Sequence, residues 1–268
     1  METHSLAVVG GGNMGIALIG GLLACDWIQP HDLAIVEVLP AQRAALLERF
    51  PGTTVTDTIP PCTAALIAVK PPDAAAATAA AVAAGATRIL SVAAGVSIST
   101  LQSAAGPDVA VVRSMPNTPA LVGLGAAAMS AGQTATAADL AWAGEILGAV
   151  GIVETVPEYQ LDAVTGLAGS GPAYLFLVAE ALIDAGVLAG LSRATSEALT
   201  TQLLLGSAAM LAERGNPAAL RAMVTSPGGT TAAGLKALED RATRAAFQSA
   251  VMAATERSRE LGKASESA

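Results

Sequence analysis

The chain has 268 residues, which is enough for two domains with a hydrophobic core each. Its net charge of −8 argues against nucleic acid or an anionic membrane surface as a partner, because the field of the whole protein would repel both. The two cysteines, Cys25 and Cys62, have no second thiol or histidine at ligand spacing, so neither a metal site nor a disulfide framework is expected. The first residues also lack the basic region of a signal peptide, and we therefore expect a reduced, cytoplasmic protein.

Hydrophobic residues make up 53% of the chain and charged residues only 13%, so a membrane-spanning helix has to be considered. The uncharged stretch 114–138 is interrupted by Pro116, Pro119 and three glycines. Much of the remainder is alanine, which is too weakly apolar to span a bilayer. We expect a soluble, alanine-rich protein with no membrane partner.

The first part of the chain alternates short apolar runs with helical patterns, which is typical of a parallel sheet with crossover helices. The runs are continuously apolar, as strands covered on both faces are. They are Leu6–Val9, Leu33–Val36, Ala65–Val69, Ile89–Val92 and Val109–Arg113. Runs at 126–130 and 151–156 can extend the sheet, and the alanine-rich segment 74–84 predicts a helix. We therefore expect an α/β fold, with a Rossmann-type doubly wound parallel sheet over residues 1–157.

After Pro157 no strand pattern recurs, and an all-helical domain is expected over residues 158–268. Its first helix, 173–191, is apolar nearly all round, so a partner chain is expected to cover it. Three more helices are expected. They cover 192–214 with Ser192 as the cap, 217–224 with Pro217 in the first turn, and about 231–261 with a break near Asp240, Gly262 as the stop and a frayed tail after it.

The segment LAVVGGGNMG places a GxGxxG motif at Gly10, Gly12 and Gly15, between a predicted strand and a predicted helix. Gly10 allows the tight turn, Gly12 lets the backbone approach a diphosphate, and Gly15 lets helix and strand pack closely. Asn13 and Met14 complete the motif at the helix amino terminus, which attracts phosphate. Many glycine-rich turns bind nothing, but here the strand, the glycine spacing, the helix and the following strand all fit a dinucleotide site. Residues 1–157 are therefore expected to form a dinucleotide-binding domain.

Glu37 stands at the end of the second predicted strand, where an acid accepts hydrogen bonds from the adenosine ribose. This position favours NAD, although a solvated glutamate at a strand end would have the same sequence. A 2′-phosphate would need a cation, and Arg43 is the nearest candidate. Both NADH and NADPH remain possible.

Two further loops follow predicted strands at the same carboxyl edge, where ligands of open parallel sheets bind. The cofactor residues expected on these loops are Ala68, Val69, Lys70 and Pro71 in the first, and Ala93, Ala94 and Gly95 in the second. Lys70 can equally be a surface charge.

The loop SPGGTT at 226–231 combines two glycines and three hydroxyl side chains immediately before a predicted helix. Such a loop can turn several backbone N–H groups toward one anion, for example a carboxylate. Taken alone, it can also be a plain connection between helices with Thr231 as the cap.

The chain resembles pyrroline-5-carboxylate reductases from end to end. The shared segments are GGGNMG, AVKP, VAAGVS, MPNTPALVG (115–123), LDAVTGLAGSGPAY (161–174) and VTSPGGTTAAGLKALE (224–239). The last segment is the family's most specific mark, and together with the dinucleotide motif it favours the anion pocket over a plain connection.

The resemblance implies hydride transfer from NAD(P)H to the C=N bond of 1-pyrroline-5-carboxylate, giving L-proline in the final step of proline biosynthesis. It implies that Gly228, Gly229 and Thr230 bind the substrate carboxylate, that the catalytic Thr231 hydroxyl meets the ring nitrogen, and that Ser226 shapes the loop. Glu158 falls where some members have a glutamate near the substrate. Asn117, a further expected cofactor residue, and Thr118 would line the cleft between the domains. The family forms dimers through its helical domain, often stacked as a pentamer of dimers.

A protonated cyclic imine is already an electrophile, so no strong acid is needed, and His4 and His31 are both expected to be solvated. Two alternatives stay open at this point. One is a related reductase acting on another cyclic imine or a 3-hydroxy acid, and the other is a dinucleotide-binding regulatory protein without turnover.

Overall fold

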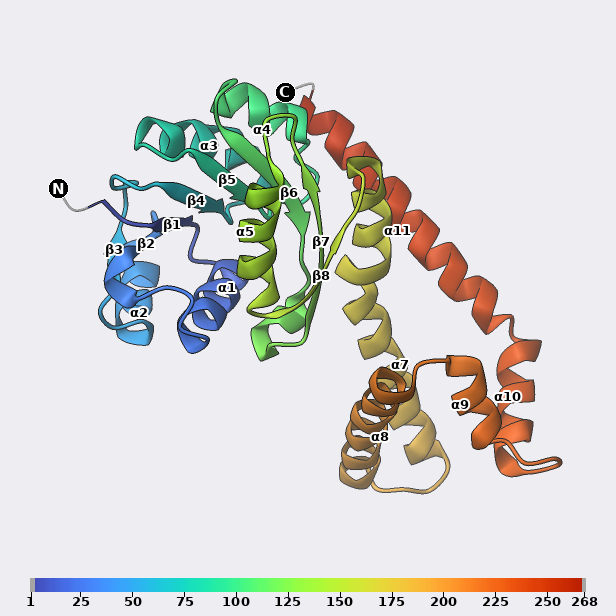
Figure 1. The fold of residues 1–268 in the computed structure, drawn as a ribbon. Coiled ribbons are helices and arrows are strands. Elements are labelled where there is room, and N and C mark those ends of the chain that lie inside the picture. The colour runs from blue at the N-terminus through green and yellow to red at the C-terminus, as the bar shows by residue number, and fades with distance from the viewer. Residues whose placement is uncertain (1–2, 267–268) are drawn as a thin grey trace. The chain divides into compact units, whose positions relative to one another are not determined.

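The computed structural model of the chain describes residues 3–266, and the side chains of residues 3–263. An eight-stranded sheet dominates its first part, with the order β3-β2-β1-β4-β5-β6-β7-β8 (Figure 1). The strands are β1 (Leu6–Val9), β2 (Leu33–Val36), β3 (Thr54–Thr56), β4 (Ala64–Ile67), β5 (Arg88–Ser91), β6 (Ala110–Met115), β7 (Gly125–Ala131) and β8 (Gly151–Thr155). The strand order reverses beside β1, which is the switch point of a doubly wound sheet. The expected Rossmann-type fold is confirmed.

The last two strands run opposite to the others. β7 pairs antiparallel with β6, with Ser114 opposite Met129, and β8 pairs parallel with β7. Residues 116–124 are too few for the crossover that a parallel neighbour would need, so β7 has to turn back. The predicted extension of the sheet is confirmed, while a fully parallel sheet is wrong for this edge. β3 is a short, partly exposed edge strand that the apolar pattern does not indicate.

Both faces of the sheet are covered, as the continuously apolar strands predict. In β1, Leu6 and Val8 belong to one core cluster, with side chains of α1 (Asn13–Ala24), α2 (Pro40–Arg49) and α5 (Ala137–Gly148). Ala7 and Val9 belong to the other cluster, with side chains of α3 (Ala74–Ala83) and α4 (Ile98–Ala105). The two layers of helices hold the strand ends, and therefore the loops after them, in place.

The chain after β8 is helical, as expected. It contains α6 (Leu161–Val164), a π-helical turn (Thr165–Gly169), α7 (Gly171–Leu188), α8 (Arg193–Arg214), α9 (Pro217–Met223), α10 (Thr230–Asp240) and α11 (Thr243–Glu266). The expected Ser192 cap forms, since its side chain accepts a hydrogen bond from the N–H of Thr195. The expected break near Asp240 is also present, with Ala242 in a left-handed conformation at φ 54°.

Gly262 does not stop the last helix, because α11 continues through it to Glu266. A single glycine lowers helix propensity by only about 1 kcal/mol, and no proline follows to enforce an end. The prediction of a frayed tail after Gly262 is therefore wrong for residues 263–266, which are helical. Residues 267–268 lie outside the described part of the chain.

His4 is buried, contrary to the expectation that it is solvated, whereas the His31 side chain is exposed as expected. The chain before β1 pairs with the segment before β4, where the N–H of His4 donates to the carbonyl of Pro61. This pairing places the imidazole ring of His4 inside the protein, where its Nδ1 lies 3.2 Å from the carbonyl oxygen of His31.

Contacts within the chain define two compact units. One comprises Met1–Ser170 and Met252–Ala268, here called the sheet unit, and the other comprises Gly171–Val251, here called the helical unit. Each is described by itself below.

Candidate active site

The glycine-rich turn after β1 needs glycine for different reasons at each position. Gly10 has φ 112°, and an added Cβ would lie 2.5 Å from the carbonyl oxygen of Ala68. At Gly15 an added Cβ would collide with the carbonyl oxygen of Gly10. Gly12, the N-cap of α1, has nothing within 4 Å of an added Cβ and no side chain to cap the helix. No side chain at Gly12 therefore covers the first amides of α1, which include those of Asn13 and Met14. This arrangement leaves room for a diphosphate at the amino terminus of the helix.

Glu37 lies at the end of β2 and is held by the backbone around it. Its Oε2 accepts a hydrogen bond from the N–H of Gly11 at 3.0 Å, and its Oε1 accepts one from the N–H of Leu39 at 2.9 Å. Arg43 does not pair with this carboxylate. Its guanidinium donates to the carbonyls of Glu37 and Val38 and lies 3.6 Å from a carboxylate oxygen of Asp57.

The two other expected cofactor loops follow β4 and β5 at the same carboxyl edge. The N–H of Ala68 donates to Val9 in β1, and the N–H of Val92 donates to Ile67 in β4, so both loops start in register with the glycine turn. A cavity of about 970 Å³ adjoins them. Its lining includes Pro71, Ala94 and Gly95 from the expected cofactor set, and Arg257, Ser258 and Leu261 from the part of α11 in the sheet unit. Lys70 is exposed, and Val69 is partly buried.

The turn between β5 and α4, residues 92–97, is anchored on both sides. At its start, the N–H of Ala93 donates to the hydroxyl of Ser91 at 3.3 Å. The hydroxyl of Ser114 in turn donates to the carbonyl of Ser91 at 3.0 Å. At its end, the side chain of Ser97 caps α4 by accepting a hydrogen bond from the N–H of Thr100.

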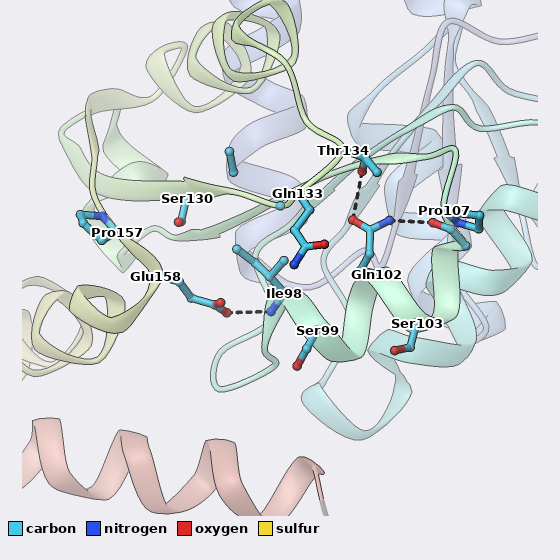
Figure 2. A pocket seen from close by; sticks show the side chains of 13 residues that line it. Ile98, Ser99, Gln102, Ser103, Pro107, Ser130, Gln133, Thr134, Pro157 and Glu158 are labelled. Carbon is cyan, nitrogen blue, oxygen red and sulfur yellow. Dashed lines mark hydrogen bonds between the residues drawn. The ribbon is translucent and has the colours of Figure 1, made fainter.

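Glu158 begins the short 3-10 helix η4 (Glu158–Gln160), just after β8. Its Oε1 accepts a hydrogen bond from the N–H of Ile98 at 2.7 Å and another from the guanidinium of Arg113 at 2.8 Å. Figure 2 shows Glu158 facing the first turn of α4, beside a cavity of about 900 Å³ whose lining includes the side chains of Ser99, Gln102 and Gln133. Any contact of Glu158 with a ligand would have to use Oε2.

Asn117 is buried and uses both ends of its amide. Its Oδ1 accepts a hydrogen bond from the N–H of Ala126 in β7, and its Nδ2 donates to the carbonyl of Ala168 in the π-helical turn. The side chain therefore ties the sheet to that turn. Thr118, by contrast, is exposed.

The loop 226–231 lies in the helical unit and ends in α10. Gly228 has φ 69°, which favours glycine, and Gly229 is the N-cap of α10, so no side chain covers the first amides of that helix. An added Cβ at Gly229 would collide with the hydroxyl of Ser226. Thr231 stands in the first turn of α10 and is partly buried. The carbonyl of Ser226 accepts a hydrogen bond from the N–H of Gly229 at 3.1 Å, and Thr230 and Thr231 stand in the first turn of α10, whose amides have no partner within the helix.

The expected cofactor residues thus gather at the carboxyl edge of the sheet unit, while the loop 226–231, expected to bind the substrate, belongs to the helical unit. Arg113 and Ser114 are the functional candidates that sequence reasoning missed. A charged residue at the end of an otherwise buried strand is the signal that could have indicated Arg113.

Titratable groups add little chemistry to this arrangement. Among the described residues, no group of three or more His, Cys, Asp or Glu side chains could hold a metal ion. Burial raises the pKa of the Cys62 thiol. For Asp139, desolvation opposes ionisation, but hydrogen bonds from Thr136 and the charge of Arg88 outweigh it and lower its pKa.

Comparisons with known families cover most of the chain. The pyrroline-5-carboxylate reductase dimerisation family matches residues 158–261, and the family of coenzyme F420-dependent NADP oxidoreductases matches residues 5–95.

Full-length relatives carry the name pyrroline-5-carboxylate reductase. The protein from Mycobacterium tuberculosis is 42% identical, with 96% of each chain covered. The protein from Synechocystis is also 42% identical, with 96% of this chain and 98% of the relative covered.

Solved structures of pyrroline-5-carboxylate reductases have a fold similar to that of this chain. The one from Coxiella burnetii has a TM-score of 0.89 and 33% identity, covering 97% of this chain and 99% of the other. The one from Plasmodium falciparum, which has NADP bound, has a TM-score of 0.82 and 30% identity, covering 98% and 99%.

Proposed function

Because the chain belongs to the pyrroline-5-carboxylate reductase family, we propose that it reduces the C=N bond of 1-pyrroline-5-carboxylate to L-proline, the last step of proline biosynthesis. The observation that carries this proposal is the presence in one chain of two anion cradles. One is the open glycine turn at the carboxyl edge of the sheet, and the other is the SPGGTT loop before α10.

The cofactor is NAD(P)H, and its reduced nicotinamide supplies the hydride that goes to the ring carbon of the C=N bond. We assign the diphosphate to the turn Gly10–Gly15, with Asn13 and Met14 at the amino terminus of α1. Ala68–Pro71 and Ala93–Gly95 continue along the same edge, and we assign them to the rest of the dinucleotide. We assign Asn117 to the cofactor site as well, as a residue that stabilises the side of the site by tying the sheet to the π-helical turn.

The loop 226–231 is the proposed substrate site. The backbone N–H groups of Gly228 and Thr230 would bind the substrate carboxylate, aided by the dipole of α10. The N–H of Gly229, expected to join them, donates to the carbonyl of Ser226 at 3.1 Å and would have to exchange that partner for the substrate. The hydroxyl of Thr231 would bond the ring nitrogen and hold its proton in place. Because His4 is buried and His31 lies between α1 and β2, we assign neither a proton-transfer role. Catalysis would rest on orientation and electrostatics.

Within NAD(P)H, we infer a preference for NADH. The carboxylate of Glu37 is fixed beside the turn by two backbone N–H groups, and the guanidinium of Arg43 is occupied by two carbonyls. A 2′-phosphate would meet the anion without a ready cation. The test is the ratio of kcat/KM for NADH to that for NADPH, and a ratio below one would contradict the inference.

We also propose a cytoplasmic homodimer formed through residues 158–268, with a pentamer of dimers as its larger assembly. The described helical stretch 158–188 is long and apolar enough to cross a membrane by length and composition. A partner chain explains it better, because α7 carries Glu180 and Asp184, and charged groups are costly inside a bilayer. Exposed Leu175, Phe176 and Leu177 would then be covered by the second copy. A monomer by light scattering at micromolar concentration would contradict this.

The reaction itself is tested by following nicotinamide absorbance with pyrroline-5-carboxylate, with another cyclic imine and with a 3-hydroxy acid. Turnover mainly with the first is expected. Turnover mainly with another substrate would favour a related reductase, and no turnover with any of them would favour a regulatory dinucleotide-binding protein.

A further inference from the structure

We propose that Glu158 is a positioning residue that holds the turn 92–97 for the nicotinamide half of the cofactor, and is not a ligand of the substrate. This inference rests on the proposed function, because it assumes that the turn meets a bound dinucleotide. It changes the role that family resemblance implies for Glu158.

The first argument is the pair of hydrogen bonds to a single oxygen. Oε1 of Glu158 is 2.7 Å from the backbone nitrogen of Ile98 and 2.8 Å from Nη1 of Arg113. Charge-assisted hydrogen bonds of this length are among the stronger ones in proteins. The carboxylate therefore joins the first turn of α4 to strand β6.

Without Glu158, the first backbone N–H group of α4, that of Ile98, would lose its hydrogen-bond acceptor. The first amides of a helix have no partner within the helix, and the Ser97 side chain serves only the N–H of Thr100. The carboxylate serves the N–H of Ile98, and its charge is favourable at a helix amino terminus. Since the turn 92–97 leads directly into α4, fixing the first residue of the helix fixes the end of the turn.

The turn 92–97 is anchored at both ends by side chains. Ser91 and Ser114 hold its start, and Ser97 and Glu158 hold its end. Between them, Gly95 has φ 74°, a conformation that glycine adopts without the steric cost of a side chain. Loss of the Glu158 anchor should therefore loosen the segment that is assigned to the nicotinamide.

The fourth argument concerns Arg113, whose side chain is only 11% exposed. A nearly buried guanidinium is costly unless an anion accompanies it, so Glu158 and Arg113 should act as a unit. Their substitutions should then have effects that do not add.

The experiment measures binary binding, without substrate, of NADH and of ADP-ribose, which lacks the nicotinamide. For Glu158→Ala we expect the Kd for NADH to rise about tenfold, equivalent to about 1.4 kcal/mol, and the Kd for ADP-ribose to stay as in the wild type. Glu158→Gln keeps an oxygen acceptor for Ile98 and should show a smaller rise. Glu154→Ala removes an exposed carboxylate of β8 and is the matched control, with no change expected.

A second comparison separates positioning from general damage. Arg113→Ala should raise the Kd for NADH by a factor similar to that of Glu158→Ala, and the double variant should bind no more weakly than either single variant. An unchanged Kd for NADH in Glu158→Ala, with a raised KM for pyrroline-5-carboxylate, would show substrate contact and overturn the proposal. Equal losses of NADH and ADP-ribose binding would show general damage and also overturn it. Failure of the wild type to bind NADH would instead contradict the proposed function.

Discussion

The two glycine-rich turns of the chain, 10–15 and 226–231, both lead into a helix with a glycine N-cap, but they are held in place differently. Each leads into a helix whose N-cap is a glycine, Gly12 for α1 and Gly229 for α10, so that no side chain caps the first amides, as a site for an anion requires. In the first turn, an added Cβ at Gly10 or Gly15 would collide with backbone. In the second turn, an added Cβ at Gly228 would meet nothing within 4 Å, and one at Gly229 would collide with the hydroxyl of Ser226 and lie 3.2 Å from its carbonyl oxygen.

This difference teaches how the two sites depend on the fold. The first turn is fixed by the close approach of β1, α1 and the end of β4, which are parts of the sheet unit itself. The second turn is fixed by its own local contacts. Substitutions at Gly10 or Gly15, where the first turn touches its neighbours, should therefore change stability and ligand binding together, while substitutions in the second turn should change binding alone.

The largest effect is expected for Gly15→Ala, because the added Cβ would push against the carbonyl of Gly10. We expect a clear fall in Tm and a loss of about 3 kcal/mol in NADH binding, which is more than 100-fold in Kd. Gly12→Ala is the matched control, since the added Cβ there meets open space. It should weaken NADH binding without lowering Tm, and a similar fall in Tm for both variants would break the comparison.

Thr231→Ala should follow, with kcat lowered about 100-fold, because the hydroxyl that accepts from the ring N–H and orients the reacting C=N bond is removed. The Kd for NADH and the Tm should change little. Thr231→Ser keeps the hydroxyl and should restore most of the activity. Unchanged turnover in Thr231→Ala would remove this residue from the mechanism.

Gly229→Ala tests the second turn in the way that Gly15→Ala tests the first. The added Cβ would collide with the hydroxyl of Ser226, which can rotate away, and would lie 3.2 Å from the carbonyl oxygen of Ser226, which needs to shift only slightly, so Tm should stay within about 1 °C of the wild type. The KM for pyrroline-5-carboxylate should rise about tenfold as the loop amides shift, equivalent to about 1.4 kcal/mol. A large fall in Tm would show that this turn is as embedded as the first.

The smallest effect is expected at Asp139, which belongs to neither turn. Its carboxylate accepts hydrogen bonds from Thr136 and pairs with Arg88 at 2.9 Å. Because folding lowers its pKa, the stabilisation is present above the unfolded pKa of about 3.9 and is lost as pH falls through the lower folded value. Asp139→Asn should cost about 1 kcal/mol of unfolding free energy at pH 7, and less below pH 4. Asp108→Asn, at an exposed site, should cost nothing at either pH.

Much of the fold can be predicted from the sequence, because strands buried on both faces must be apolar throughout. β3 cannot, since three partly exposed residues at an edge carry no such pattern. The reversed direction of β7 follows from the length of one connection, which the apolar pattern does not record. The burial of His4 depends on pairing with a segment almost 60 residues away.

The candidate site divides in the same way. The turn at 10–15 can be predicted because strand, glycines and helix are contiguous in the sequence. The loop at 226–231 has no such context, and family resemblance was needed to favour a substrate site there. The contact of Glu158 with Ile98 and Arg113 joins three separate elements, so no local pattern could indicate it.

The backbone bonds of Glu37 have an entropic consequence for cofactor binding. Ordering a free glutamate side chain costs up to about 2 kcal/mol in rotamer freedom. Here the N–H groups of Gly11 and Leu39 already hold the carboxylate, so that cost is met when the protein folds. The adenosine ribose would then meet a preorganised acceptor, and its share of the affinity should persist across temperatures at which a mobile side chain would lose it.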